Sequence, residues 1–304
     1  MIRESFVSTF QFGRIDFDVS KFLQLKGVEN PSVFIDKTGP AHLKHAGPEQ
    51  NTLSLGLDAS KKLAKSYPNS LEKVENLISV TESPYLSFPG NSSRIASSLN
   101  LSESTYLYDL NAGCTGFIDA VSLSFKLKTP TLIVCSEIYS KRDLHNNKAT
   151  GCLFSDASAA TFFDPTKFEL IYEDFVYKKN TATAICFNEY ESLVMDGTAV
   201  FQFLNTHVVP LIDQAFKKHP TLTKFFCHQG SALVVSRIKN LFSKPGLNIA
   251  SNIVKRGNSV SATLPILVED SHKKDPINKD DLILMVGFGV GLQAHLLIIR
   301  PSHV

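Results

Sequence analysis

The sequence lacks the features of a membrane protein, an exported protein or a basic nucleic-acid-binding protein. It has no uninterrupted apolar run near the about 18 residues of a membrane-spanning helix, so we expect no transmembrane span. Its first residues include Glu4 and no long apolar stretch, which argues against a signal peptide. The net charge of +2, from 31 Lys+Arg and 29 Asp+Glu, is too small for nucleic-acid binding through bulk charge.

Cysteine is scarce, and its spacing excludes two further classes of protein. The five cysteines are odd in number and form no CxxC pair, unlike a disulfide framework or a zinc knuckle. His42 and His45 have HxxH spacing without an evident third ligand, so we expect no metal site. We predict reduced thiols, at least four of them buried, in a cytoplasmic protein. The cysteines are Cys114, Cys135, Cys152, Cys186 and Cys227.

What remains is the composition of a globular chain with a large core. The 304 residues are 43% hydrophobic and 20% charged, and no linker-like or low-complexity tract interrupts them. Apolar runs alternate with amphipathic stretches, which predicts an α/β fold. We place a boundary at Asp164 and Pro165, which gives two related α/β halves over residues 1–164 and 165–304.

The expected elements follow from the hydrophobic periodicity. We predict helices over residues 51–66, 94–99, 116–126 and 199–218, and a further helix after Gly230. We predict strands over residues 74–83, 105–110, 131–137, 157–163, 224–227, 282–286 and 295–299.

Cys114 lies between a predicted strand and a predicted helix, flanked by Gly113 and Gly116. Small neighbours let the backbone turn tightly and leave room for a substrate. A helix N-terminus lowers the pKa of a thiol, and its free N–H groups can stabilise an oxyanion. The pattern therefore suits a nucleophilic cysteine, and it suits equally a buried structural cysteine in a tight turn.

Two other polar residues stand at comparable positions. His228 follows the predicted strand 224–227, and the carboxyl ends of strands are where α/β sheets gather functional groups. Asn258 follows Gly257 in a polar loop before a helix, where a turn or helix-cap role is common. A Cys, His and Asn set also occurs in papain-like proteases. Those enzymes carry an aromatic-flanked cysteine near the mature N-terminus, whereas Cys114 lies deep in the chain.

The glycines near the C-terminus do not form a dinucleotide-binding loop. Gly287, Gly289 and Gly291 have part of the required spacing, but Leu292 stands where the third fingerprint glycine belongs. The remaining residues are too few for a βαβ unit. Glycines that let the backbone approach a reacting carbonyl explain the pattern better.

Several motifs, in matching order, resemble those of β-ketoacyl-acyl-carrier-protein synthase III, a condensing enzyme of thiolase fold. The active-site motifs are matched by residues 111–117, 228–229 and 257–262. Further family signatures are resembled by residues 156–160, 195–201 and 286–291.

The resemblance implies a thiolase-like α-β-α-β-α architecture and a homodimer. Cys114 would receive an acyl group from a thioester of coenzyme A or acyl carrier protein. A malonyl thioester on acyl carrier protein would then lose carbon dioxide, with His228 and Asn258 donating to the enolate oxygen. The backbone at Cys114, Gly289 and Gly291 would hold the other oxyanion. The product would be a β-ketoacyl chain for fatty-acid or specialised lipid biosynthesis, made without a resident cofactor.

Less specific residues are also implied. Phe88 matches a family position that shapes the acyl pocket across the dimer interface. Arg237, Lys239 and Arg256 lie close in sequence to the active-site motifs and are candidate contacts for an acidic carrier protein. The chain has no Trp for stacking on the adenine of coenzyme A, and Arg is scarce before residue 94. These departures suggest a changed acyl donor.

Two alternatives keep the fold and change the function. In one, the acyl group on Cys114 passes to an oxygen or nitrogen nucleophile, a reaction that does not need the enolate-binding Asn258. In the other, the chain is a non-catalytic partner subunit of a synthase, and Cys114 forms no acyl adduct.

Overall fold

Two five-stranded sheets with the same strand order form the framework of the protein. The computed structural model describes residues 4–142, 147–190 and 192–302. The first sheet has the order β1 (Phe6–Phe12), β7 (Ala157–Phe163), β6 (Thr131–Glu137), β4 (Asn76–Val80) and β5 (Tyr106–Leu110). The second has the order β8 (Phe168–Tyr177), β14 (Gln293–Pro301), β13 (Ile283–Gly289), β11 (Lys224–Cys227) and β12 (Asn248–Ile249).

Pairing directions also repeat between the sheets. In the first sheet β6, β4 and β5 run parallel, while β7 is antiparallel to both β6 and β1. In the second sheet β13, β11 and β12 run parallel, while β14 is antiparallel to both β13 and β8. Asp164 and Pro165 lie between β7 and β8, so the predicted boundary falls between the two sheets; its exact position stays a prediction.

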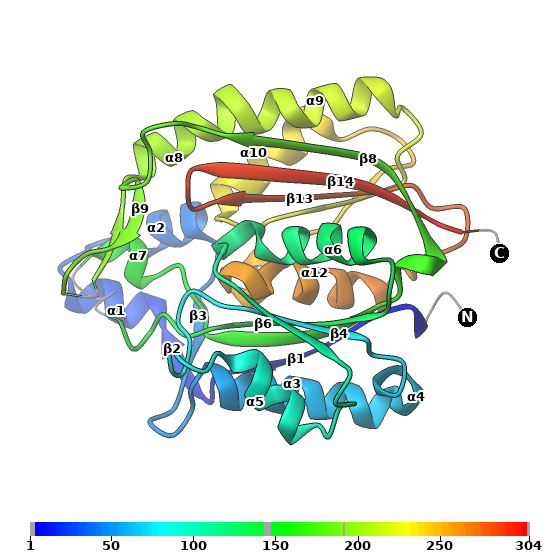
Figure 1. Cartoon of the computed structure of the whole chain (residues 1–304). Coiled ribbons are helices and arrows are strands. Elements are labelled where there is room, and N and C mark those ends of the chain that lie inside the picture. Colours follow the sequence, from blue (N-terminus) through cyan, green and yellow to red (C-terminus); the bar gives the residue numbers. More distant parts are fainter. Residues whose placement is uncertain (1–3, 143–146, 191, 303–304) are drawn as a thin grey trace.

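Helices form three layers around these sheets (Figure 1). The outer face of the first sheet carries α3 (Thr52–Ser66), α4 (Pro68–Leu71) and α5 (Asn91–Ser98). Between the sheets lie α6 (Gly116–Leu127) and α12 (Thr263–His272). The outer face of the second sheet carries α9 (Val209–Lys218) and α10 (Ala232–Phe242). The predicted α-β-α-β-α layering is therefore confirmed.

The layers follow from the pattern of apolar residues. Helix α3 begins where the Asn51 side chain accepts a hydrogen bond from the Ser54 N–H, and it buries Leu55, Ala59 and Leu63 on one face. Helix α6 has to bury more than one face because it lies between two sheets. Both Phe117 and Val121 on this helix are fully buried, as are several of its small residues.

Shorter elements gather at one end of the layered core (Figure 1). They are β2 (Ile15–Asp18), α1 (Val19–Leu25), α2 (Pro31–Thr38), β3 (His42–His45), α7 (Lys148–Gly151), β9 (Ile185–Phe187), β10 (Leu193–Met195), α8 (Gly197–Phe203) and α11 (Ile253–Arg256). His42 and His45 both lie on β3, and the His45 ring stacks on Phe17 with 4.2 Å between ring centroids.

The predicted elements are present, with differences in several of their bounds; β4, for example, ends at Val80 and not at residue 83. The predicted strand 282–286 continues as β13 to Gly289, and the predicted helix 199–218 is interrupted by a π turn over Leu204–Val208. Strands β1, β8 and β12 of the two five-stranded sheets were not predicted. Four cysteines are buried and Cys186 is half-buried, as expected for reduced thiols. Within the described ranges, no helix is long and apolar enough to cross a membrane.

Candidate active site

Cys114, His228 and Asn258 line one cavity of about 340 Å³. Cys114 lies in a short 3-10 turn, Gly113–Thr115, between β5 and α6. His228 follows β11 directly, and Asn258 follows α11. The carboxyl ends of the parallel strands in the two sheets thus meet at this cavity, the usual place for functional groups in such sheets. The structure therefore brings together all three residues that the sequence singled out.

The Cys114 thiol is buried and protonated rather than activated by its surroundings. Its side chain is 9% exposed. Burial raises the pKa of Cys114 well above its usual value, and the nearby carboxyls of Glu82 and Glu137 raise it further. The predicted lowering of this pKa by the helix N-terminus is wrong, because loss of solvent outweighs it. A thiol in this state needs a proton acceptor when it reacts.

Gly289 brings backbone directly against the nucleophile. A Cβ at this position would lie 2.9 Å from the Cys114 Cβ and 3.0 Å from its Sγ. Gly289 also lines the cavity, whereas Gly291 does not. Gly291 lies in the turn between β13 and β14, where its carbonyl accepts a hydrogen bond of 2.9 Å from the Thr181 hydroxyl. The backbone packed against the thiol is thus that of Gly289, and the predicted role of Gly291 stays a prediction.

His228 is held as a neutral imidazole. The side chain is 2% exposed, and burial lowers its pKa to about 3. Its backbone N–H donates to the Val286 carbonyl at 2.8 Å, and its ring meets the Phe288 ring edge-on at 5.6 Å between centroids. Among the described residues, no group forms a hydrogen bond with its Nδ1. The imidazole is therefore available to a substrate as a neutral hydrogen-bonding group.

Asn258 has a fixed amide orientation. Its Oδ1 accepts hydrogen bonds from the Val260 N–H at 2.8 Å and from the Thr263 hydroxyl at 3.2 Å. Its Nδ2 has only a weak contact of 3.4 Å with the Gly230 carbonyl. Because the oxygen is already used, the amide presents its N–H groups as donors. Asn258 lines the same cavity as Cys114.

The rest of the cavity wall is mainly apolar. Such a wall suits an alkyl chain, with the few polar groups collected around the thiol. Its apolar residues include Leu153, Phe154, Met195, Val200, Leu204 and Val234.

Three polar residues beside the thiol, of which two are buried and Glu82 is partly buried, were missed by the sequence analysis. Glu82 follows β4, Glu137 ends β6, and Tyr139 comes two residues later. The Tyr139 hydroxyl donates to the Glu82 carboxylate, and the Glu82 N–H donates to Glu137 at 3.1 Å. An acid directly after an apolar strand was the available signal for Glu82. It was overlooked because the predicted strand was drawn through residue 83.

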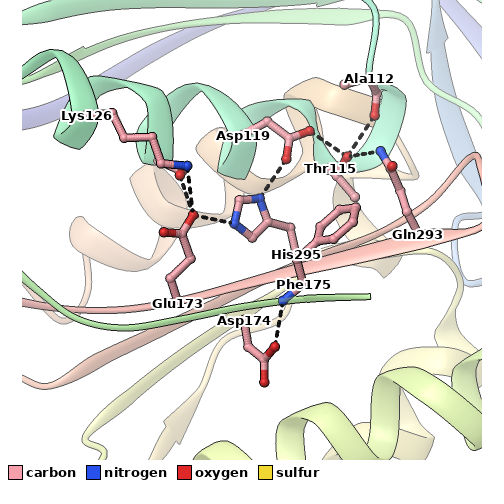
Figure 2. Close-up of polar contacts among 10 residues, drawn as sticks. Ala112, Thr115, Asp119, Lys126, Glu173, Asp174, Phe175, Gln293 and His295 are labelled. Atoms are coloured by element: carbon pink, nitrogen blue, oxygen red, sulfur yellow. Dashed lines mark hydrogen bonds and ion pairs between the residues drawn. The ribbon is translucent and has the colours of Figure 1, made fainter. Parts of the chain in front are cut away.

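Thr115, next to Cys114, begins a hydrogen-bonded network that secures α6 to the second sheet (Figure 2). Its hydroxyl contacts Asp119 at 2.7 Å, and Gln293 donates to it at 2.8 Å. Asp119 contacts His295 Nδ1 at 2.7 Å, and His295 Nε2 lies 3.0 Å from Glu173 on β8. Burial alone would raise the pKa of Glu173, but hydrogen bonds from Ser122 and His295 lower it. This network holds the start of the helix that follows the nucleophile.

Phe88 lies outside the cavity of its own chain. Its side chain is 89% exposed and is absent from the cavity wall. The sequence-based role placed it in the pocket of a second copy, and that role stays a prediction.

The three candidate basic residues, Arg237, Lys239 and Arg256, differ in their exposure and in their contacts within the protein. Arg256 forms a bidentate pair with Asp270, with two contacts of 2.8 Å, and its guanidinium lies over the Phe10 ring at 4.9 Å. Its guanidinium is therefore already paired within the protein, and its predicted contact with a carrier protein stays a prediction. Lys239 is half-buried in a second groove together with Arg256. Arg237 on α10 is exposed, with one contact of 3.3 Å to Asn205.

Comparison with known proteins agrees with this arrangement. Residues 213–300 match the family described as 3-oxoacyl-[acyl-carrier-protein] synthase III C terminal. The chain is 25% identical over 278 residues to β-ketoacyl-[acyl-carrier-protein] synthase III 2 of Deinococcus radiodurans, covering 84% of this chain and 82% of that protein. The corresponding protein of Bacillus anthracis is 25% identical over 287 residues, covering 86% and 87%.

The chain is therefore similar over most of its length to β-ketoacyl-[acyl-carrier-protein] synthases III, and its residues 213–300 match the C-terminal region of that family. The fold is similar to the solved structure of the Thermus thermophilus synthase III, with a TM-score of 0.89 and 21% identity over 98% of both chains. This likeness confirms the thiolase-like fold expected from the sequence.

Proposed function

We propose that this chain is an acyl-transferring condensing enzyme that lengthens an acyl thioester by decarboxylative condensation with malonyl-acyl carrier protein. The observation that carries the proposal is the meeting of Cys114, neutral His228 and oriented Asn258 in one apolar cavity. The names of the relatives support the same activity in fatty-acid biosynthesis.

In the first half-reaction the acyl group moves to Cys114. The sulfur forms a bond to the thioester carbonyl carbon, the bond from that carbon to the donor sulfur breaks, and the donor leaves as a thiol. The Gly289 backbone packed against the sulfur leaves space for the reacting carbonyl. The acyl chain then occupies the apolar cavity.

The second half-reaction needs the two donors. When the malonyl thioester loses carbon dioxide, the electron pair of the broken bond forms an enolate. His228 and Asn258 would donate to its oxygen, and neutral donors suit this role because they stabilise charge without transferring a proton prematurely. The enolate carbon bonds to the acyl carbonyl, the bond to Cys114 breaks, and the sulfur takes up a proton. Transfer to an oxygen or nitrogen nucleophile would not use Asn258, so its fixed orientation favours condensation.

The proposed enzyme is a homodimer that joins along β5. This strand is an edge of the first sheet, and it exposes Tyr106 by 68% and Leu107 by 41%. An apolar unpaired edge tends to be covered by another strand, and a second copy of β5 offers the same surface. Phe88, 89% exposed, would then reach the pocket of the partner copy.

The remaining features of the proposal concern location and partners. The acyl carrier protein is acidic, so the exposed Arg237 is the preferred contact of the three basic residues. The proposed chemistry uses only side chains and thioester substrates, and therefore no resident cofactor. Unpaired cysteines suit a cytoplasmic enzyme.

Intact-protein mass spectrometry tests the first half-reaction. The chain and Cys114→Ala are incubated with acyl-coenzyme A and acyl-carrier-protein donors of several lengths. We expect a mass gain in the wild-type chain and none in Cys114→Ala. Adding malonyl-acyl carrier protein should then remove the acyl group and release carbon dioxide. Absence of an adduct with every donor would contradict the proposal and favour a non-catalytic subunit.

A further inference from the structure

Glu82, Cys114 and Tyr139 follow three neighbouring parallel strands of the first sheet. Strand β4 lies between β6 and β5, so Glu82 stands in sheet order between Tyr139 and Cys114. Strands that run parallel end at the same edge of a sheet. The topology therefore places a partly buried carboxyl and a phenol beside the thiol.

The contacts of Glu82 place its carboxyl against the nucleophile turn. A Cβ on Gly113, the residue before Cys114, would lie 2.5 Å from the Glu82 Oε1. The other oxygen of Glu82 accepts the hydrogen bond from the Tyr139 hydroxyl. Tyr139 belongs to the same buried cluster as Cys114 and lines the same cavity. Glu82 itself does not line the cavity, so its path to the reacting group runs through Tyr139.

Tyr139 is rigidly held. Its backbone N–H donates to Asp156 at 2.8 Å, and its ring packs on Phe154 at 4.9 Å and on Phe187 at 5.4 Å between centroids. The acceptor for its hydroxyl is therefore set by the structure, because the ring cannot turn away from Glu82 without losing this packing.

Glu137 is hydrogen-bonded to the backbone of Glu82. It accepts hydrogen bonds from the Glu82 N–H at 3.1 Å, the Ser261 hydroxyl at 2.6 Å and the Ser83 hydroxyl at 3.3 Å. Burial raises the pKa of Glu137 well above its usual value, and the Glu82 charge raises it further. The titratable groups around Glu82 are thus Glu137, Tyr139 and Cys114.

His228 is not suited to accept the proton of the Cys114 thiol. The pKa of Cys114 is raised by burial and by Glu82 and Glu137, so the thiol keeps its proton until it reacts. An imidazole whose pKa burial lowers to about 3 is a poor base near neutral pH. Burial raises the pKa of Glu82, which makes its carboxylate a better proton acceptor than an exposed one.

We propose that Glu82, acting through the Tyr139 hydroxyl, accepts the Cys114 proton during acyl loading and returns it to the departing thiol. As the sulfur bonds to the acyl carbon, its proton moves to the Tyr139 oxygen and the Tyr139 proton moves to Glu82. When the bond to the donor sulfur breaks, the same two protons move back, and the donor leaves as a neutral thiol. The relay ends as it began, with Tyr139 protonated and Glu82 ionised. Glu82 thus acts through Tyr139 and does not contact the substrate itself. The inference rests on the proposed acyl-transfer function.

The test compares acyl loading with simple alkylation of the same thiol. Glu82→Gln keeps the size of the side chain and removes its negative charge. We expect acyl loading from the preferred donor to slow by roughly 100-fold, the lower end of general-base contributions. Alkylation by iodoacetamide should move to lower pH, because removing a negative charge lowers the pKa of Cys114. A structural or purely electrostatic role predicts that loading rises or stays equal as alkylation becomes easier, and that outcome would overturn the inference.

Two further variants complete the experiment. Tyr139→Phe removes the relay hydroxyl with almost no change in volume, and we expect the same fall in loading; loading at the wild-type rate would overturn the inference. Glu269→Gln is the matched control. Glu269 is a partly buried carboxyl on α12 that forms an ion pair of 3.1 Å with Lys273, and neither residue lines the cavity. Its loading should equal that of the wild type. A wild-type chain that takes no acyl group would overturn the proposed function instead, which separates the two failures.

Discussion

The Gly289 backbone and the Cys114 sulfur are so close that a single added methyl group would occupy the space between them. A Cβ on Gly289 would lie 3.0 Å from the Sγ, which is tighter than van der Waals contact allows. The nucleophile is therefore positioned against backbone of the other half of the chain, and the space for a reacting carbonyl depends on a missing side chain.

Gly289→Ala should abolish most acyl loading while the chain still folds. The methyl group has to displace either the thiol or strand β13, and a displaced nucleophile loses on the order of 100-fold in rate. Mass spectrometry measures the loading, and thermal unfolding checks the fold. Gly47→Ala is the matched control, because a Cβ there meets only the flexible end of Glu49. Equal loading by both variants would contradict the proposed placement of the substrate carbonyl.

His228 should make the protein less stable in mild acid. Its pKa is about 3 in the folded chain and 6.5 when exposed, so below pH 6.5 the unfolded chain binds a proton that the folded chain does not. The free energy of unfolding of the wild type, relative to His228→Gln, should fall by about 2 kcal/mol between pH 7 and pH 5. Urea unfolding at several pH values measures this difference. A constant difference across that range would show that His228 is not held neutral.

Arg256 and Arg237 should respond differently to removal. Arg256→Ala leaves the half-buried Asp270 without its bidentate partner, and we expect a loss of about 1–3 kcal/mol in the free energy of unfolding. Asp270 should also titrate at higher pH, because hydrogen bonding to Arg256 lowers its pKa against the effect of burial. Arg237→Ala should instead leave stability unchanged and weaken binding of acyl carrier protein. Calorimetric titration with the carrier protein decides between these roles.

Tyr106→Lys should separate the proposed dimer. A lysine on the exposed β5 edge places like charges opposite each other when two copies pair, which disfavours association. Light scattering should report a smaller species, and loading with long acyl chains should change if Phe88 contributes to the partner's pocket. Lys61→Ala, on the solvent side of α3, is the control. A wild-type chain that is monomeric at all concentrations would contradict the dimer.

The sequence was sufficient to locate Cys114, His228 and Asn258, because Cys114 and His228 each follow a predicted strand and the motifs around all three residues resemble those of a known family in matching order. It was insufficient where the outcome depends on distant partners. The pairing of β1 with β7 joins Phe6 to Phe163, and no local pattern specifies that contact. The ion pair between Arg256 and Asp270 and the burial of Cys114 likewise depend on residues that are distant in the sequence. The pKa of the thiol was therefore predicted in the wrong direction, and Glu82 was missed because the predicted strand was drawn through residue 83.

The repeated strand order gives the cavity an internal pseudosymmetry. Strand β4 of the first sheet corresponds to β11 of the second, and β5 corresponds to β12. Glu82 and His228 therefore follow equivalent strands, and so do Cys114 and Asn258. Because two sheets of the same strand order both contribute residues to the cavity, the residues at the end of one sheet can change without changing those of the other. One edge carries the covalent attachment point and its acidic neighbours, and the other carries two neutral donors. Covalent attachment of the acyl group and hydrogen bonding to the enolate are thus assigned to different sheets of the same topology.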